Sequence, residues 1–543
     1  MGLPPGKVVV PLRQKGPSPI KLGPLLQLLQ QYPVVQDRAY LGEGFQRGFR
    51  IPYQGPRVSS WAKNLRSVKG LEQVVRAKID KEVQEGRVLG PFPHPPLPSF
   101  RVSPLGVVPK KAKGEYRLIH HLSFPAGGSV NDAIPHQLCS VKYTTFEAAV
   151  EMVREQGKGA LMGKCDIKSA FRLLPVHPDD FDLLGFSFEG SYYIDRALPM
   201  GCSISCSAFE RFSSFLEWAV RERAGLTSVV HYLDDFLFCC PGPLSTCKYL
   251  MDTFHELAKE LGVPLAPEKT EGPTTRLAFL GIEIDTVAQC CRLPPEKVLA
   301  LEQRLRQLLD ARKVTLRDLQ VIVGHLNFAC RVIAPGRAFL RRLCDATKGL
   351  RAPHHRVRVT HELREDARMW VEFLRDFNGI SLWRSKFLLE AELQIQSDAA
   401  GGHGFGLFFR GRWCASRWPP AWIEMGVTRD MTFLEFFPIV VAVHIWARDF
   451  EDRAVQFWCD NMATVQVINS GTSRSPRVMR LVRCFTLQCL RHNILFAARH
   501  VPGLDNSIAD ALSRMQEERF RTLAPAAREL PEVFPPHLWN LGF

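Results

Sequence analysis

The stretch that decides the fold is Val229-Val230-His231-Tyr232-Leu233-Asp234-Asp235-Phe236-Leu237-Phe238. Apolar and aromatic residues on both sides favour strands, and the Asp-Asp pair between them favours a tight turn, so the stretch predicts a β-hairpin with two carboxylates at its tip. Adjacent carboxylates among apolar strands are costly unless a cation neutralises them. Paired carboxylates suit Mg²⁺, and two such ions can stabilise both oxygens of an in-line phosphoryl displacement. The alternative is a solvated Asp-Asp turn.

The composition is that of a globular, basic protein. The chain has 543 residues, of which 46% are hydrophobic and 23% charged, and 70 Lys and Arg against 55 Asp and Glu give a net charge of +15. This excess predicts attraction to polyanions, nucleic acid first and anionic membrane second. Solubility alone is the alternative reason for the charge.

Cysteine usage and hydropathy indicate an intracellular protein, in the cytoplasm, the nucleus or both, and not a secreted one. The 15 cysteines are odd in number and irregularly spaced, no zinc-finger spacing occurs, and the N-terminal stretch lacks an apolar signal core. The most apolar long run, 431–447, is too short to span a bilayer and contains Glu435 and Pro438. We therefore expect a buried helix there and no membrane attachment.

Composition and periodicity divide the chain into six predicted segments. The first 60 residues are rich in Pro and Gly and basic, which indicates an extended or partly ordered arm. The later segments alternate strand and helix, except for an Arg- and Leu-rich helical part. The predicted segments are an N-terminal extension (1–60), a first catalytic region (61–290), a helical region (291–350), a connection (351–392), a second catalytic region (393–515) and a C-terminal tail (516–543).

Acidic residues recur at strand ends in the first catalytic region. Asp166 ends the predicted strand 161–166, and Asp234 and Asp235 lie at the hairpin tip. If these strands are neighbours in one sheet, the three carboxylates converge. Strand 102–111 and its predicted antiparallel partner 116–120 carry the basic residues Lys110 and Arg117.

At these residues the sequence resembles reverse transcriptases, because several segments follow one another in that family's order over roughly 180 residues. They are the strand pair with Lys110 and Arg117, Cys165-Asp166-Ile167-Lys168-Ser169-Ala170-Phe171, Leu198-Pro199-Met200-Gly201, Tyr232-Leu233-Asp234-Asp235, Pro267-Glu268-Lys269-Thr270 and Phe279-Leu280-Gly281-Ile282. The resemblance implies an α+β polymerase right hand with fingers, palm (61–290) and thumb (291–350).

The resemblance also implies roles at individual positions. The catalytic carboxylates Asp166, Asp234 and Asp235 would hold two Mg²⁺, with Mn²⁺ as an alternative, and Lys110 and Arg117 would neutralise the incoming dNTP. The other implied substrate contacts are Met200 and Gly201 under the templating base pair, Tyr232 beside the carboxylates, and Phe279, Leu280 and Gly281 at the primer end. The last three lie in a strand that we predict over 277–284.

Three implied roles have a structural alternative. Phe171 would exclude a ribose 2′-OH, or is a core Phe. Lys269 would donate a proton to the leaving pyrophosphate, or is a surface Lys. The Arg-rich helices after residue 290 would contact the duplex backbone, or are solvated. The sequence also departs from the family after Arg117, where no acidic residue follows in 118–123, and at Met200, where many retroviral-type enzymes carry Gln. Both departures affect nucleotide contacts rather than the metal ligands.

A second set of acids lies at element ends in 393–515. Asp398 ends strand 393–398, Glu435 lies in the first turns of a helix begun near Thr432, Asp460 ends strand 455–460, and Asp510 lies in a helix for which we predict Asn506-Ser507 as the N-cap. Four carboxylates from four elements can form another two-metal site.

This order, Asp, Glu, Asp, Asp, resembles ribonuclease H, an α/β fold with a mixed sheet. His500 precedes Asn506 by six positions and Asp510 by ten, as in that family. The resemblance implies Asp398, Glu435, Asp460 and Asp510 as catalytic metal ligands and His500 as an aid to proton transfer or product release. A structural His is the alternative. Arginines in 474–491 would contact the hybrid duplex, or form a solvated helix face.

The residues of three segments look most like those of DIRS-type (Ngaro-like) retrotransposons. They are Tyr116-Arg117-Leu118-Ile119-His120-His121-Leu122-Ser123-Phe124-Pro125 with Ser129-Val130-Asn131-Asp132, and Ala509-Asp510-Ala511-Leu512-Ser513-Arg514. The resemblance implies RNA template, DNA primer, RNA–DNA hybrid and dNTPs as partners, and a gag-like protein and a tyrosine recombinase from the same element. Oligomeric state is left open.

The leading hypothesis is therefore an RNA-directed DNA polymerase, able also to copy DNA, with intrinsic ribonuclease H for retrotransposon replication. A second hypothesis is a catalytically silent or host-adopted nucleic-acid-binding protein, against which stands the presence of all seven expected acids. A third is a group II intron or telomerase type polymerase, which the fused ribonuclease H segment disfavours.

Overall fold

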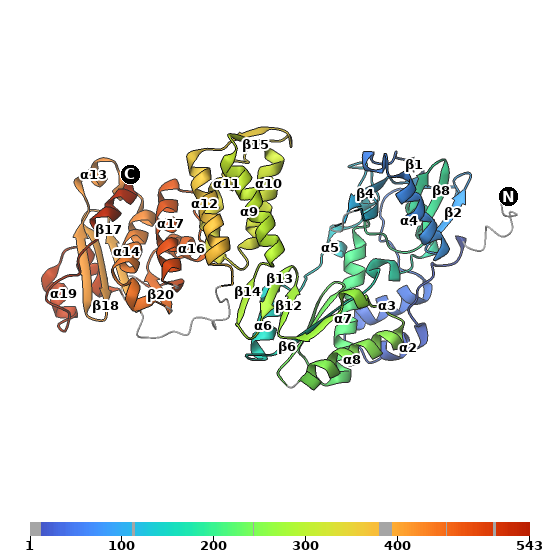
Figure 1. Cartoon of the computed structure of the whole chain (residues 1–543), viewed down its shortest axis with the longest axis horizontal. Helices are drawn as coiled ribbons and strands as arrows, with labels where there is room; N and C mark the ends of the chain where they lie inside the picture. Colours follow the sequence, from blue (N-terminus) through green and yellow to red (C-terminus); the bar gives the residue numbers. More distant parts are fainter. Residues whose placement is uncertain are drawn as a thin grey trace. The chain divides into compact units, whose positions relative to one another are not determined.

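The computed structural model describes residues 12–110, 114–242, 244–379, 394–451, 453–492, 494–502 and 506–543 (Figure 1). The chain forms two compact units: the first is 1–280 with 284–288, and the second is 281–283 with 289–543. The predicted boundary between connection and second catalytic region, near 392, lies outside the described residues. Among the described residues, no helix combines the length and apolar character needed to cross a bilayer.

The palm of the first unit is a four-stranded antiparallel sheet in the order β11-β6-β10-β9. Its helices α7 and α8 pack against each other, and α8 contributes Phe254, whose ring lies 4.7 Å from that of Phe236 on β10. The elements are β6 (Leu161–Asp166), α7 (Ile204–Ala224), β9 (Val229–Tyr232), β10 (Asp235–Cys240), α8 (Leu244–Leu261) and β11 (Glu271–Thr274). The predicted hairpin is present, with Leu233 in the left-handed region at its turn (φ 54°).

The fingers contain a second sheet, in the order β1-β3-β7-β8-β2, and the separate antiparallel pair β4-β5. The pair sets Val108 opposite Arg117, so the predicted pairing of these two strands is confirmed. The elements are β1 (Ser60–Trp61), α4 (Glu72–Gln84), β2 (Val88–Phe92), β3 (Arg101–Val102), β4 (Leu105–Pro109), β5 (Tyr116–His120), α5 (His136–Cys139), α6 (Phe146–Glu155), β7 (Gly185–Phe188) and β8 (Ser191–Asp195).

Residues 12–60, the described part of the N-terminal segment, do not form an extended arm. They form α2 (Leu22–Leu29) and α3 (Val35–Arg47), whose buried residues Leu25, Leu41 and Phe45 belong to the palm core. The ring of Phe45 lies 5.0 Å from that of Phe212 on α7. The apolar side chains of both helices therefore outweigh the Pro and Gly content that suggested an arm.

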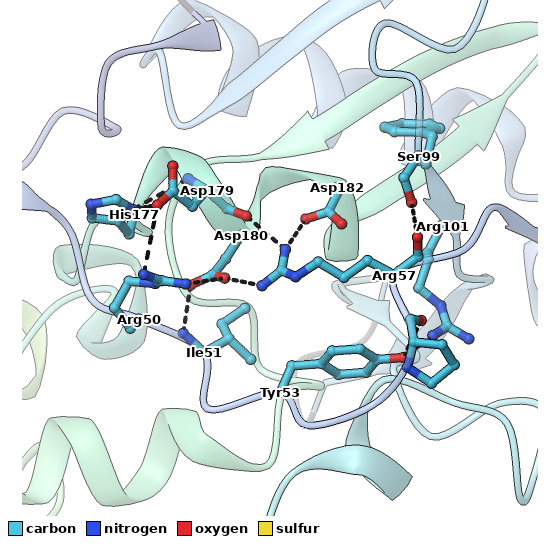
Figure 2. A network of polar contacts seen from close by, with 12 residues as sticks. Arg50, Ile51, Tyr53, Arg57, Ser99, Arg101, His177, Asp179, Asp180 and Asp182 are labelled. Atoms are coloured by element: carbon cyan, nitrogen blue, oxygen red, sulfur yellow. Dashed lines mark hydrogen bonds and ion pairs between the residues drawn. The ribbon is translucent and has the colours of Figure 1, made fainter.

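Ion pairs hold the next part of this segment (Figure 2). Asp180, in the 3-10 helix η4 (Pro178–Leu183), is fully buried and pairs with Arg50 at 2.8 Å and with Arg57. Its Oδ2 also accepts the backbone N–H of Ile51 at 2.9 Å. A buried carboxylate with this many donors fixes the path of the chain around residues 50–57.

The second unit begins with a helical thumb and connection. Its elements are α9 (Pro295–Asp310), β15 (Lys313–Thr315), α10 (Leu316–Ala329), α11 (Arg341–Asp345), β16 (Arg356–Arg358) and α12 (His361–Asp376). The fully buried Trp370 on α12 packs against Phe373, with ring centroids 5.8 Å apart. Two short strands, β12 (Arg276–Phe279) and β13 (Ile282–Asp285), precede the thumb, with β14 (Cys290–Arg292). The single strand predicted for 277–284 is therefore interrupted.

The remainder has a ribonuclease H fold with the predicted mixed sheet, in the order β19-β18-β17-β20-β21. Strands β17, β20 and β21 are parallel, while β18 and β19 are antiparallel to their neighbours. The strands are β17 (Gln394–Ala400), β18 (Gly404–Phe409), β19 (Arg412–Arg417), β20 (Ala454–Cys459) and β21 (Leu495–His500). The helices are α13 (Pro420–Glu424), α14 (Met431–Ile445), α15 (Ala447–Phe450), α16 (Met462–Ser470), α17 (Pro476–Arg491), α18 (Ser507–Ser513) and α19 (Glu517–Leu523).

Helices cover both faces of this sheet. Phe405 on β18 packs against Phe437 of α14, with ring centroids 5.7 Å apart, while a Cβ at the next residue, Gly406, would lie 2.4 Å from Leu512 of α18. Because neighbouring strand residues face opposite sides, α14 and α18 lie on opposite faces. The predicted tail is also folded: Trp539 stacks on Phe437 at 5.2 Å, on the α14 face.

Candidate active sites

Strand pairing brings the first three acids together. Asp235, the first residue of β10, pairs with Asp166, the last residue of β6, and Asp234 lies in the adjoining turn. The backbone N–H of Ile167 donates to the Asp234 carbonyl at 2.9 Å, which fixes the hairpin tip against the end of β6. Two carboxylates from paired strands and one from the adjoining turn thus lie at the same end of these two palm strands.

The cluster carries excess negative charge. Burial and the charges of Asp234 and Asp166 raise the pKa of Asp235 to about 7, and burial and Asp166 raise the pKa of Asp234. The Lys269 ammonium lies 2.8 and 2.9 Å from the two Asp166 oxygens. Although burial lowers the pKa of Lys269, this contact raises it overall. One ammonium against three carboxylates leaves a charge that a hard divalent cation such as Mg²⁺ fits, so these residues suit the implied metal.

Basic residues line a pocket of about 530 Å³ in the first unit, in which Lys110, Arg117 and Met200 lie together with Lys168. Lys110 also contacts Glu115 at 3.0 Å, within the same β-hairpin. The charge of Arg117 lowers the pKa of Asp234, which places the guanidinium within electrostatic reach of the acidic cluster. This lining suits a polyanionic ligand such as a triphosphate.

Gly201 lies against the backbone of the fingers. A Cβ at this position would be 1.7 Å from the carbonyl oxygen of His120, so only glycine fits. Asn131 holds the same loop: its amide donates to the Gly201 carbonyl at 2.8 Å and accepts the N–H of Ser203 at 3.0 Å. The sequence analysis gave Asn131 no role, although it lies in a segment that carried the family resemblance.

The remaining predicted substrate contacts occupy different environments. Phe171 is half-buried and packs edge-to-face on Phe209 at 5.8 Å, which fits both of its predicted interpretations. Tyr232 lies 4.9 Å from the ring of Tyr143. Phe279 is buried at the end of β12, and Leu280 and Gly281 have φ values of 47° and 78°. These two residues therefore form a turn and not the predicted strand.

A buried ionic network missed by the sequence analysis underlies the basic pocket. Arg172, directly after Phe171, lies 2.8 Å from both Asp195 and Glu82, and Asp195 also contacts the His120 ring at 2.8 Å. Burial would raise the pKa of Asp195, but Arg172 and His120 outweigh it and lower that pKa. The network ties α4, β5 and β8 to the segment after Asp166. Its residues are far apart in sequence, so no local pattern could reveal it.

The second set of acids also converges. Ligand atoms of Glu435 on α14, Cys459 at the end of β20 and the following Asp460 lie within 4.8 Å of one another. Asp398 on β17 is near enough to Asp460 and Asp510 for both charges to raise its pKa, together with burial as the largest cause. The four predicted carboxylates therefore meet at one place, and an acidic set of this kind fits divalent cations.

Their local partners differ. Ser513 donates a short hydrogen bond to Asp398. Asp510 pairs with Arg514 at 2.6 Å and Arg519 at 2.7 Å, and these cations outweigh burial and lower its pKa. Burial, Asp398 and Asp460 raise the pKa of Glu435 to about 9. Within the described ranges, Glu435 Oε2 is buried without a hydrogen-bond partner.

Two further predicted residues lie beside this site. His500, exposed at the end of β21, places Nε2 3.1 Å from the Asp460 carbonyl oxygen. Asn506 precedes α18, but its side chain does not cap the helix as predicted. The amide instead donates to the Ser397 carbonyl at 2.8 Å and thereby fixes the residue before Asp398.

One arginine predicted to contact the duplex, Arg483, pairs with an acid of the protein instead. Arg483 on α17 has a side chain only 12% exposed and lies 3.5 Å from the buried Asp366 of α12. It therefore joins the ribonuclease H fold to the connection instead of facing a duplex. Arg477 and Arg480 lie on the same helix.

The palm sheet with its clustered carboxylates gives the first unit the fold of a template-copying polymerase palm, and the second unit contains a ribonuclease H fold. Residues 108–284 match the family model described as reverse transcriptase (RNA-dependent DNA polymerase). The chain thus contains a reverse transcriptase domain.

Relatives and solved structures give further likenesses. Protein P of duck hepatitis B virus (strain China) is 28% identical over 30% of this chain and 20% of its own length, and the Gag-Pro-Pol polyprotein of human T-cell leukemia virus 3 (strain 2026ND) is 24% identical over 56% and 19%. The matches thus span about a fifth of these relatives. A foamy viral protease-reverse transcriptase in complex with double-stranded DNA aligns with TM-score 0.49 and 15% identity, covering 89% of this chain and 83% of that one.

Proposed function

We propose that the protein is an RNA-directed DNA polymerase that also copies DNA templates and that cleaves the RNA strand of RNA–DNA hybrids. The observation that carries the polymerase proposal is the pairing of Asp166 with Asp235 inside the segment that matches reverse transcriptases. A foamy viral relative was solved with an RNA/DNA hybrid, and we extend such a ligand to this chain.

In this proposal, Asp166, Asp234 and Asp235 hold two Mg²⁺ at the polymerase site. The basic pocket around Lys110 and Arg117 binds and orients the dNTP triphosphate. Lys269, held against Asp166, is positioned to move a proton near the leaving group. Mg²⁺, when bound, supplies Lewis-acid stabilisation of the phosphoryl oxygens.

The ribonuclease H proposal rests on Asp398, Glu435, Asp460 and Asp510, which come from four elements of the second unit. Glu435 is buried among these acids, and His500 lies at the rim next to the Asp460 backbone. We also propose that the chain serves a DIRS-type retrotransposon inside the cell, with a gag-like protein and a tyrosine recombinase as partners.

The test follows both strands in one reaction. Full-length protein is given a labelled RNA template, a DNA primer, dNTPs and Mg²⁺. We expect Asp234→Asn to abolish primer extension but to keep cleavage of a preformed hybrid, and Asp398→Asn to do the reverse. Each variant is the matched control of the other. Folded wild-type protein that binds hybrid but extends no primer and cleaves no RNA would favour a silent binding protein.

A further inference from the structure

A thiol lies among the ribonuclease H carboxylates. The sulfur of Cys459 and carboxylate oxygens of Glu435 and Asp460 lie within 4.8 Å of one another. Cys459 is fully buried and Glu435 is only 4% exposed, while Asp460 is half-buried and leaves the site open to solvent. Mg²⁺ makes no use of such a sulfur, because it prefers oxygen ligands.

One carboxylate oxygen of this cluster, Glu435 Oε2, is buried without a donor from the described residues. By contrast, Asp398 is held by Ser513 and Asp510 by two arginines. A buried carboxylate oxygen without a partner is costly, and a cation removes that cost. Glu435 and Asp460, the two acids beside the thiol, have no such side-chain donor among the described residues.

The geometry is close to that of a zinc site. With Zn–S of about 2.3 Å and Zn–O of about 2.0 Å, two donors on one tetrahedral ion are roughly 3.5 Å apart. Donor atoms that already lie within 4.8 Å of one another need to approach by little more than about 1 Å to reach this spacing. Three protein ligands leave a fourth position for water, and mixed sulfur and oxygen donors favour Zn²⁺ over Mg²⁺.

We propose that Cys459, Glu435 and Asp460 form a binding site for a thiophilic divalent cation, with Zn²⁺ as the physiological class, and that this cation competes with Mg²⁺ for the ribonuclease H carboxylates. When the cation binds, a metal–sulfur bond forms and the thiol proton leaves to solvent. No electrons are transferred. The competition part of the inference rests on the proposed ribonuclease H function.

Cobalt tests the sulfur ligand directly. Co²⁺ bound by a thiolate gives a sulfur-to-metal charge-transfer absorption in the near ultraviolet, and carboxylate-bound Co²⁺ does not. Full-length protein titrated with Co²⁺ is expected to show this absorption, and Cys459→Ser is expected to lose the corresponding intensity. Cys414→Ser is the matched control, because Cys414 is a buried cysteine of the same sheet outside the cluster. Equal absorption in wild type and Cys459→Ser, with both proteins folded by circular dichroism, would overturn the site.

Glu435→Gln gives a second test that keeps the sulfur. We expect its Co²⁺ affinity, read from the same absorption, to fall by about tenfold or more, since losing a ligand of a metal set weakens binding at least as strongly as losing a supporting residue. Unchanged affinity would remove Glu435 from the site.

Competition is read as inhibition. Hybrid cleavage in Mg²⁺ is measured over a buffered Zn²⁺ series, with each variant normalised to its own zinc-free rate. Half-inhibition is expected at an about tenfold higher Zn²⁺ concentration in Cys459→Ser than in wild type. Sulfur–cobalt absorption without any cleavage would refute the ribonuclease H proposal but leave the metal site standing. Cleavage without that absorption would refute the metal site alone.

Discussion

Asp235 stands directly opposite Asp166 across the central strand pair of the palm. Side chains at opposite positions of an antiparallel pair are neighbours, and like charges there are destabilising. Strand pairing therefore brings two anions together in a partly buried place, and the proposed metal ions would neutralise this repulsion.

Removing one of these charges should stabilise the metal-free protein while it destroys the site. The pKa of Asp235 is raised to about 7, so above that pH its ionised form weakens the folded state relative to an unfolded chain with the ordinary value of 3.8. We expect Asp235→Asn to raise stability by about 1–3 kcal/mol at pH 8 with chelator, and to abolish primer extension. Thermal unfolding measures the first effect. The control is Asp252→Asn, which changes an exposed residue of α8. If Asp235→Asn were less stable than Asp252→Asn, the repulsion would be contradicted.

His231 gives the first unit a defined pH dependence. It is buried between Glu217 at 2.5 Å and Glu210 at 3.2 Å; burial opposes its charge, but the two carboxylates raise its pKa from 6.5 to about 9. A raised pKa adds stability that is complete below pH 6.5 and is lost as the pH rises through about 9. Over this window we expect wild type to lose up to about 3 kcal/mol more than His231→Gln in urea unfolding. Exposed His94→Gln should follow wild type, and parallel curves for wild type and His231→Gln would exclude a protonated His231.

Gly201 should not accept a methyl group. Its Cβ would overlap the His120 carbonyl, which belongs to backbone and cannot rotate away. We expect Gly201→Ala to cost about 1–3 kcal/mol and to lower primer extension, because the loop next to Met200 must move. Gly242→Ala is the matched control, since a Cβ there meets nothing within 4 Å. Urea unfolding and extension rates decide the matter, and two equally stable variants would refute the overlap.

Asp180 should contribute more to the stability of the folded state than its exposed neighbour Asp179. Asp180→Asn leaves Arg50 and Arg57 without their shared buried anion (Figure 2). We expect a loss of about 3 kcal/mol, at the low end for buried pairs because the Arg50 side chain is 55% exposed. Asp179→Asn changes a side chain that is 66% exposed and should cost under about 1 kcal/mol. Limited proteolysis near residues 50–57 gives a second readout. Similar losses in both variants would mean that the ion pairs do not anchor this segment.

The parts of the fold that the sequence predicts are those with strong local signals. The hairpin at 229–238 combines apolar strands with an Asp-Asp turn, and its strands pair as expected. The prediction of one strand over 277–284 is wrong because Leu280 adopts the left-handed region, where a bulky side chain is unusual. The sequence did not predict the helices of 12–60 or the packing of Trp539, because the stability of both comes from tertiary contacts with residues far away in sequence.

The sites followed the same rule. The structure gathers the seven acids into two groups, as motif order predicted. Asp398 does not end its strand as predicted, because β17 continues to Ala400 and pairs there with β18. The network of Arg172, Asp195 and Glu82 joins separate elements, and no spacing encodes it. Asn506 sits at the predicted position, but a neighbouring strand carbonyl takes its amide.

The helices α2 and α3 have a consequence for how this chain can be divided. The segment recognisable by similarity begins at residue 108, yet Leu25, Leu41 and Phe45 fill the same core as Phe212. The recognisable motif and the cooperative folding unit therefore have different edges. A fragment trimmed to the motif would expose an apolar face of α7, and transfer of the catalytic segment between proteins would require the N-terminal helices to travel with it.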